Sequence, residues 1–313
     1  MTTPLGPADL DAGRFETRTF DGRGFRMVFV HENPGGVPLL LVHGWPETKR
    51  IFWRVIEPLA AAGFEVIVPD LRGFGDSEPA PDGFGDTAAC ARDLGALLAH
   101  LGHDRVVAAG GDFGGPVVQA LAQLRPDLVG RLVLYNCPLP GDAGLFPDSA
   151  GRAVAATDYF IRQGTDPDGL AAELASAQQR RRYVATMYTS RFWVHPGAFS
   201  ADAVEFHTEP FGDPTRFRAG LEPYRSVFDR SARSEDLRLA ANPAVPVLVL
   251  YGPSDHVVPE GFDRRAAAVF PAHVGPFLLR DCGHFVPWEA PHAFVTATTA
   301  FAGDLLALAR YRA

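Results

Sequence analysis

The chain has few cysteines, no excess of basic residues and no long apolar run. Its 313 residues include three cysteines, without the spacing of a metal site or a disulfide framework, which favours a reducing compartment. The formal net charge is −8 and the pI is near 5.7, which argues against a nucleic-acid-binding surface. No stretch approaches the roughly 18 to 20 apolar residues that span a bilayer, and the first twenty residues show no signal-peptide pattern. We therefore expect a cytoplasmic protein that binds neither nucleic acid nor membrane.

The apolar pattern predicts an α/β fold. Two alternating segments flank the hairpin signal Asp21-Gly22-Arg23-Gly24. Solid apolar runs follow, as in strands buried on both faces of a parallel sheet, and helical stretches separate them. The predicted strands are 14–20, 24–32, 38–43, 64–69, 105–110, 132–135, 245–251 and 277–280, and the predicted helices are 51–62, 87–101, 115–124 and 291–309.

The βαβ rhythm stops near Pro138 and resumes only at Val245. The segment between them has helical patches and aromatic residues but no buried-strand run. We therefore predict a discontinuous core, 1–139 and 242–313, with a mostly helical lid domain over 140–241.

A tight strand–turn–helix segment surrounds Asp112. It reads small-x-Asp-x-small, with Gly110 and Gly114 as the small flanking residues, because the backbones crowd at such a turn. The middle side chain is presented at the carboxyl edge of the sheet, where ligands bind. This is the G-x-S-x-G nucleophile elbow with Asp in place of Ser. A phosphate loop does not fit, since neither the Gly-Lys-Ser/Thr ending nor G-x-G-x-x-G spacing is present.

Two further polar residues follow predicted strands and complete a candidate triad. Asp255 comes after the strand 245–251, and His284 lies in the loop after the last strand. The chain order of nucleophile, acid and histidine is the order that this kind of fold uses. Asp281 is a rival acid, but its place directly before Cys282-Gly283 favours a role in the turn.

The loop His43-Gly44-Trp45-Pro46 follows the first buried strand. The backbone N–H groups of Trp45 and Phe113 can converge on a developing oxyanion. His43 is expected to support the loop and not to react.

Together these motifs resemble the α/β-hydrolase family and, within it, the epoxide hydrolases. The loop at Trp45 is similar to the family motif H-G-x-P, whose X-Pro bond is characteristically cis, and Asp70–Ser77 is similar to the turn after the next strand. The resemblance covers roughly 14–139 and 243–310. It implies a mostly parallel eight-stranded sheet flanked by helices, with the inserted segment as a lid.

The resemblance also implies two lid tyrosines that hold the epoxide oxygen. Asp158-Tyr159 is similar to a family site at the start of a lid helix. The run from Phe217 to Arg225 is similar to an aromatic helix of the form F-R-x-x-L-x-x-Y-R, which selects Tyr224. Tyr159 and Tyr224 are therefore the candidate acids, with Trp45, Phe113 and Phe160 as candidate substrate contacts. No cofactor and no metal are implied.

The predicted reaction is hydrolysis of an apolar epoxide to a vicinal diol, in which Asp112 forms an ester that water activated by His284 and Asp255 then cleaves. Two alternatives stay open: a haloalkane dehalogenase with the same triad, and a catalytically silent relative that binds ligands. Dehalogenases of this kind carry Trp after the nucleophile, where this chain has Phe113. A homodimer is also an expectation.

Overall fold

The computed structural model describes residues 6–141, 154–240, 245–258 and 261–312. An eight-stranded sheet with the order β1-β2-β4-β3-β5-β6-β7-β8 forms its centre. β2 runs antiparallel to β1 and to β4, and the remaining pairs are parallel. The strands are β1 (Thr17–Gly22), β2 (Phe25–Glu32), β3 (Val37–Val42), β4 (Phe64–Pro69), β5 (Val106–Gly111), β6 (Val129–Tyr135), β7 (Val247–Tyr251) and β8 (His273–Leu278). The predicted fold class is confirmed.

The β1–β2 hairpin closes as its sequence predicts. Gly22 pairs with Phe25 across a two-residue loop. Both loop residues, Arg23 and Gly24, have positive φ angles of 52° and 87°, the backbone form that matches the twist of the flanking strands.

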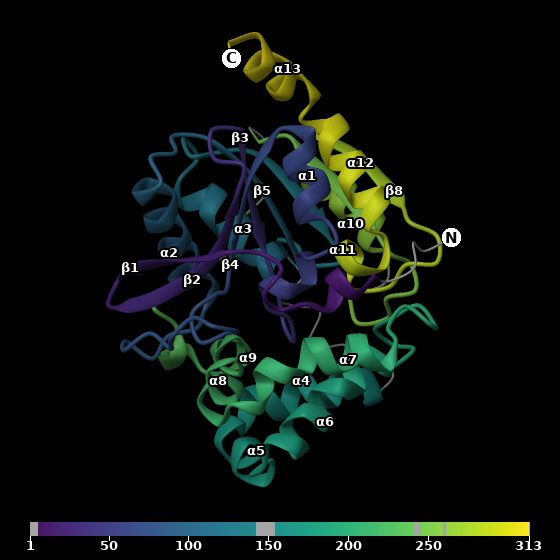
Figure 1. The fold of residues 1–313 in the computed structure, drawn as a ribbon. Helices are drawn as coiled ribbons and strands as arrows, with labels where there is room; N and C mark the ends of the chain where they lie inside the picture. Colours follow the sequence, from purple (N-terminus) through teal and green to yellow (C-terminus); the bar gives the residue numbers. More distant parts are fainter. Residues whose placement is uncertain (1–5, 142–153, 241–244, 259–260, 313) are drawn as a thin grey trace.

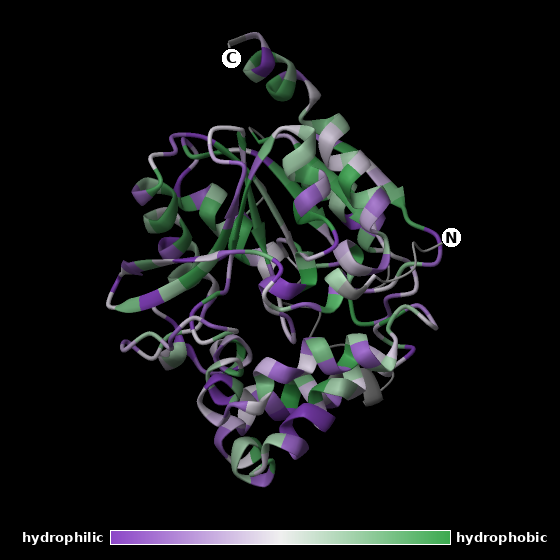
Figure 2. Ribbon diagram, viewed as in Figure 1, coloured by the Kyte–Doolittle hydropathy of each residue, from purple (hydrophilic) through white to green (hydrophobic). Residues whose placement is uncertain are grey.

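Helices cover both faces of the sheet. α1 and α12 pack together on one face and α2 and α3 on the other (Figure 1). Figure 2 shows the central strands as largely hydrophobic, while hydrophilic residues lie on the outer helices. The core helices are α1 (Ile56–Ala62), α2 (Thr87–His100), α3 (Gly114–Leu124), α10 (Phe262–Val269), α11 (Val286–Glu289), α12 (Pro291–Phe301) and α13 (Gly303–Arg312), with 3-10 turns at Pro7–Leu10 and Lys49–Phe52.

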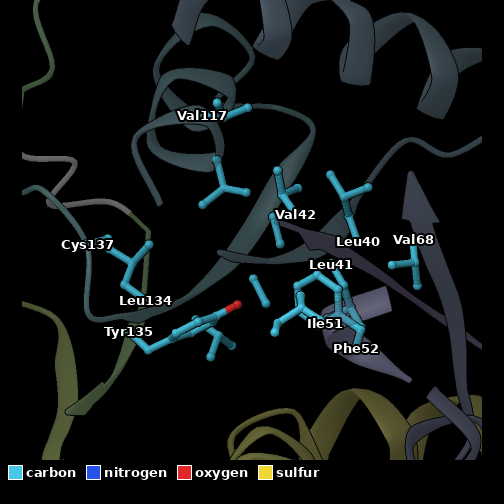
Figure 3. Close-up of a cluster of buried hydrophobic side chains, with 14 of the residues drawn as sticks. Leu40, Leu41, Val42, Ile51, Phe52, Val68, Val117, Leu134, Tyr135 and Cys137 are labelled. Carbon is cyan, nitrogen blue, oxygen red and sulfur yellow. The ribbon is translucent and has the colours of Figure 1, made fainter. Parts of the chain in front are cut away.

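The hydrophobic core lies between the sheet and these helices. Leu40, Leu41 and Val42 of β3 are fully buried and belong, with Leu134 and Tyr135 at the end of β6, to one cluster of buried side chains (Figure 3). Burying a side chain of this kind contributes roughly 1.5–3 kcal/mol. The rigid centre of the sheet therefore fixes the strand ends that carry the candidate site.

A second group of helices lies between β6 and β7 in the chain, below the sheet in Figure 1. The lid is predicted to begin at residue 140 and to end at residue 241. Residues 142–153 and 241–244 lie outside the described ranges, so the second boundary falls on residues that the structure does not describe. The helices are α4 (Val154–Thr165), α5 (Pro167–Glu173), α6 (Ala177–Thr189), α7 (Ala201–Thr208), α8 (Pro214–Ala219) and α9 (Glu222–Phe228), with 3-10 turns at Glu209–Gly212 and Arg230–Ala232.

Several predicted elements need correction. The last strand is His273–Leu278 and not 277–280, because this edge strand is only partly buried and lacks a solid apolar run. The closing helix is two helices, α12 and α13, with a 64° bend at Ala302. Tyr159 lies inside α4 and not at its start. The aromatic helix 217–225 is likewise divided between α8 and α9.

In the described ranges, no single helix meets the length and hydropathy of a membrane span. The bent pair Pro291–Phe301 and Gly303–Tyr311 meets them only when its two helices are taken together.

Candidate active site

Asp112 occupies a strained turn between β5 and α3. Its φ angle is 43°, a left-handed conformation that non-glycine residues adopt rarely and mostly at special sites. The turn has no room for larger flanking residues: a Cβ on Gly110 would lie 2.4 Å from the carbonyl oxygen of Gly114, and one on Gly114 would lie 2.2 Å from that of Val42. The crowding predicted for the elbow is therefore present, and it presents the Asp112 carboxylate at the carboxyl edge of the sheet.

The structure brings the three candidate triad residues together. His284 Nδ1 is hydrogen-bonded to Asp255 Oδ2 at 2.8 Å. His284 Nε2 lies 3.2 Å from Asp112 Oδ2. Asp281, the rival acid, is exposed in the turn before His284, with its carboxylate 81% accessible. Asp255 is thus the carboxylate that contacts His284 Nδ1.

Charge around His284 outweighs its burial. Burial alone would lower the pKa of this fully buried imidazole, but the negative charges of Asp255 and Asp112 raise the pKa well above its usual value. Asp255 is itself held by two backbone donors, since its Oδ1 accepts from the amides of Val257 at 2.7 Å and Val258 at 3.4 Å. The imidazole is therefore fixed between two carboxylates.

The loop after β3 faces the nucleophile. The Trp45 amide donates to Asp112 Oδ1 at 2.7 Å, and the Trp45–Pro46 peptide bond is cis, as the resemblance implies. Phe113 is the N-cap residue of α3, so its N–H belongs to the helix end, where backbone donors have no partner within the helix. The two N–H groups predicted for an oxyanion hole therefore lie in the loop and at the helix start beside Asp112.

His43 and Glu47 support this loop from within the core. His43 Nδ1 contacts the Gly44 carbonyl oxygen at 2.9 Å, and its Nε2 accepts from the Leu71 amide at 3.0 Å. Burial lowers the pKa of His43, which favours the neutral ring that this pattern needs. Glu47 Oε2 accepts from the Gly44 amide at 2.5 Å, and burial together with the charge of Asp112 raises its pKa to about 8.

Tyr159 of α4 and Tyr224 of α9 line the same cavity as Asp112. Their ring centroids are 6.0 Å apart, and both rings pack on Trp45, at 5.8 and 5.3 Å. The pKa of each phenol is raised well above its usual value, mainly by burial, and the negative charge of Asp112 raises it further. Both hydroxyls are therefore protonated donors at neutral pH.

A cavity of about 610 Å³ connects Asp112 to these tyrosines. This volume is typical of pockets for small organic molecules. Among the described residues, Phe113 and Phe160 line it, whereas Trp45 lies fully buried behind the tyrosines. No group of three or more His, Cys, Asp or Glu side chains suited to a metal ion occurs in the described ranges.

Two buried polar residues at this site were not predicted from the sequence. Asn136, directly after β6, donates through Nδ2 to Asp255 Oδ2 at 2.8 Å. Its backbone carbonyl oxygen accepts from the Asp112 backbone N–H at 3.0 Å. Glu289 accepts from the amides of Gly283 and Phe285, on either side of His284, at 2.8 and 2.9 Å. The position of Asn136 at a strand end, like that of Asp112, is a signal that could have identified it. Glu289 gives no comparable signal.

Comparisons with known proteins identify the family of the chain. The family model described as "alpha/beta hydrolase fold" matches residues 37–291. A soluble epoxide hydrolase of Corynebacterium sp. (strain C12) is 32% identical, with 90% of this chain and 95% of that protein covered. Haloalkane dehalogenase 2 of Mycobacterium bovis is 30% identical, with 90% and 93% covered. The solved structure of the epoxide hydrolase CorEH without ligand superposes with a TM-score of 0.79 and 28% identity, covering 93% of this chain and 99% of that one.

Proposed function

The chain belongs to the α/β-hydrolase fold family, in its epoxide hydrolase branch, and we propose that it hydrolyses an epoxide to a vicinal diol through a covalent ester on Asp112. The observation that carries the proposal is the position of Asp112 opposite Tyr159 and Tyr224 at one cavity. Opening an epoxide ring requires a nucleophile and a proton donor, and here two phenols can hydrogen-bond to the ring oxygen. The lid domain proposed over 140–241 supplies both donors and covers the nucleophile.

In the first step the Asp112 carboxylate attacks a ring carbon and forms an ester. The carbon–oxygen bond of the ring breaks, and the oxygen receives a proton from Tyr159 or Tyr224. Because an alkoxide is a poor leaving group, this proton transfer is needed for the ring to open. A serine at this position would instead give an ether, which water activated by a histidine does not cleave.

In the second step His284 acts as a base on water. Esterification removes the negative charge of Asp112, which is one of the two charges that raise the His284 pKa. The imidazole can then pass its proton on, which restores the phenol, and accept one from water at Nε2, while Asp255 keeps Nδ1 protonated. Water attacks the ester carbonyl carbon, and the amides of Trp45 and Phe113 stabilise the oxyanion. The tetrahedral intermediate then collapses and its bond to the product oxygen breaks. The departing alkoxide takes the proton of the newly formed Asp112 carboxyl, so that the diol leaves and Asp112 is ionised again.

Halide release is the second candidate function, because a dehalogenase is among the relatives at 30% identity. The indole Nε1 of Trp45 is buried without a hydrogen-bond partner among the described residues, but Trp45 does not line the cavity at Asp112. In addition, Phe113 has no side-chain N–H, and a tyrosine pair is not needed to release a stable anion.

A panel of matched epoxides and terminal haloalkanes tests the two functions directly. Diol formation should be measured by chromatography and halide release by ion analysis with the same enzyme sample. We expect diol from apolar epoxides at rates at least about 10²-fold above halide release, which is the typical contribution of a positioned acid. Halide release without diol would contradict the proposed function.

A further inference from the structure

We propose that Glu289 is a positioning residue for His284, which it serves by joining the turn around His284 to the lid segment at His195. The proposal rests on the function proposed above, in which His284 acts only after the ester has formed. Glu289 lies at the end of α11, is 3% exposed and has no contact with Asp112 among the contacts of the described residues.

Three backbone N–H groups from two separate segments converge on this one carboxylate. Oε1 accepts from Phe285 at 2.9 Å, while Oε2 accepts from Gly283 at 2.8 Å and from His195 at 2.9 Å. Each of these hydrogen bonds lowers the pKa of the Glu289 carboxyl, but burial, the larger effect, raises it to about 7. Both neighbours of His284 are therefore held by the group that also holds the lid.

The lid segment is close enough to this turn for small displacements to be transmitted. The His284 amide donates to the Trp193 carbonyl oxygen at 2.7 Å, and the Trp193 ring packs edge-on against the imidazole with centroids 4.7 Å apart. A Cβ on Gly283 would lie 2.5 Å from that same carbonyl oxygen and 2.9 Å from the His195 amide nitrogen. Only glycine allows this approach of the two backbones.

The consequence differs between the two half-reactions. Alkylation needs Asp112 and the tyrosines, none of which Glu289 holds. Ester hydrolysis needs His284 Nε2 aimed at a water beside the ester, and a displacement of about 1 Å at such a group can lower a rate by about 10²-fold. Loss of the Glu289 carboxylate should therefore slow the second step alone, whereas a general loss of stability would not separate the steps.

The experiment is single-turnover kinetics on Glu289→Gln with styrene oxide, followed by acid quench and intact-protein mass measurement of the ester. Glu65→Gln is the matched control, because Glu65 is also a buried glutamate that accepts a backbone amide, from Gly35 at 2.9 Å, but lies on β4 away from the site. We expect ester hydrolysis to slow by about 10-fold or more in E289Q, with alkylation within about twofold of wild type. E65Q should retain both rates.

Equal slowing of both steps, or no change in either, would overturn the role of Glu289. Gly283→Ala provides a second route if E289Q does not fold, because it disturbs the same junction and keeps the carboxylate. The same selective slowing is expected in G283A, and wild-type ester hydrolysis in folded G283A would refute the proposal.

His284→Gln is the reference for the proposed function. An ester that accumulates in H284Q but not in E289Q refutes the role of Glu289 alone, and the absence of ester in both variants refutes both proposals.

Discussion

His284 Nε2 faces Asp112 Oδ2 across 3.2 Å. A serine nucleophile depends on a hydrogen bond to its histidine, since the histidine must remove its proton. A carboxylate has no proton to lose, so its attack does not depend on the histidine. The two half-reactions should therefore be separable by substitution.

Replacement of His284 by Gln should stop the cycle at the ester. We expect alkylation of Asp112 to continue, because its carboxylate needs no base, and the ester to accumulate to about one per chain. Intact-protein mass measurement after mixing with an epoxide checks this. Asp281→Asn is the control: the exposed Asp281 contacts neither Asp112 nor His284 in the described ranges, so D281N should turn over normally.

Replacement of both Tyr159 and Tyr224 by Phe should nearly abolish ring opening. Each hydroxyl is a donor beside the cavity, and a positioned acid typically contributes 10²- to 10⁴-fold. The single variants should retain part of the alkylation rate, measured in single turnover. Tyr183→Phe is the matched control. The Tyr183 hydroxyl accepts a hydrogen bond from Gln163, and Tyr183 is not among the described residues that line the cavity at Asp112. A double variant with wild-type alkylation would show that the acids lie elsewhere.

The only lysine of the chain, Lys49, should be important for stability. Its side chain is 3% exposed, and its Nζ contacts Asp70 Oδ2 at 2.5 Å and also the Asp76 carboxylate. Lys49→Met leaves the Asp70 charge buried without its cation, which should lower the free energy of unfolding by about 3–5 kcal/mol. Urea denaturation measures this. Arg125→Gln, which removes an exposed pair with Asp127, should change it far less, because water screens exposed charges.

The carboxyl of Glu47 should make stability depend on pH. Its pKa rises from 4.5 in the unfolded chain to about 8 in the folded protein, first through burial and then through the charge of Asp112. Between these values the folded state binds more protons, so the free energy of unfolding falls as pH rises through that window. The shift corresponds to at most about 5 kcal/mol.

Glu47→Gln keeps an oxygen for the Gly44 amide and removes the titration. The advantage of E47Q over wild type in urea denaturation should therefore grow from pH 5 to pH 8. Glu65 has a lowered pKa, because hydrogen bonds from His31 and the Gly35 amide overcome the opposing effect of burial. Glu65→Gln should accordingly have a lower free energy of unfolding than wild type throughout this range. Parallel pH profiles of the free energy of unfolding for E47Q and wild type would contradict the raised pKa of Glu47.

The elements that were predicted accurately are those with a strong local signal. All six residues of β4 are buried, so the strand appears as an uninterrupted apolar run with the predicted bounds 64–69. β8 is an edge strand with a mixed burial pattern, and its bounds were wrong. The division between α8 and α9 follows a local break at Gly220 that the resemblance did not indicate.

The candidate site divides in the same way. Asp112, Asp255 and His284 follow strands, so their convergence could be predicted from the order of elements. Tyr159 and Tyr224 were selected by resemblance, because an amphipathic helix pattern does not distinguish a packing tyrosine from a functional one. Asn136 follows a strand, as Asp112 does, so its position was a usable signal. Glu289 gives no such signal, because its contact with His195 is made 94 residues away in the chain.

The covalent ester on Asp112 is tested most directly by a single turnover in ¹⁸O-water, with wild-type enzyme in excess over an epoxide. The peptide that contains Asp112 is then isolated by digestion and its mass is measured. We expect ¹⁸O to enter the Asp112 carboxylate, because water attacks its carbonyl carbon, and the first diol formed to carry unlabelled oxygen from the enzyme. An unlabelled Asp112 with ¹⁸O in the first diol would contradict the covalent route.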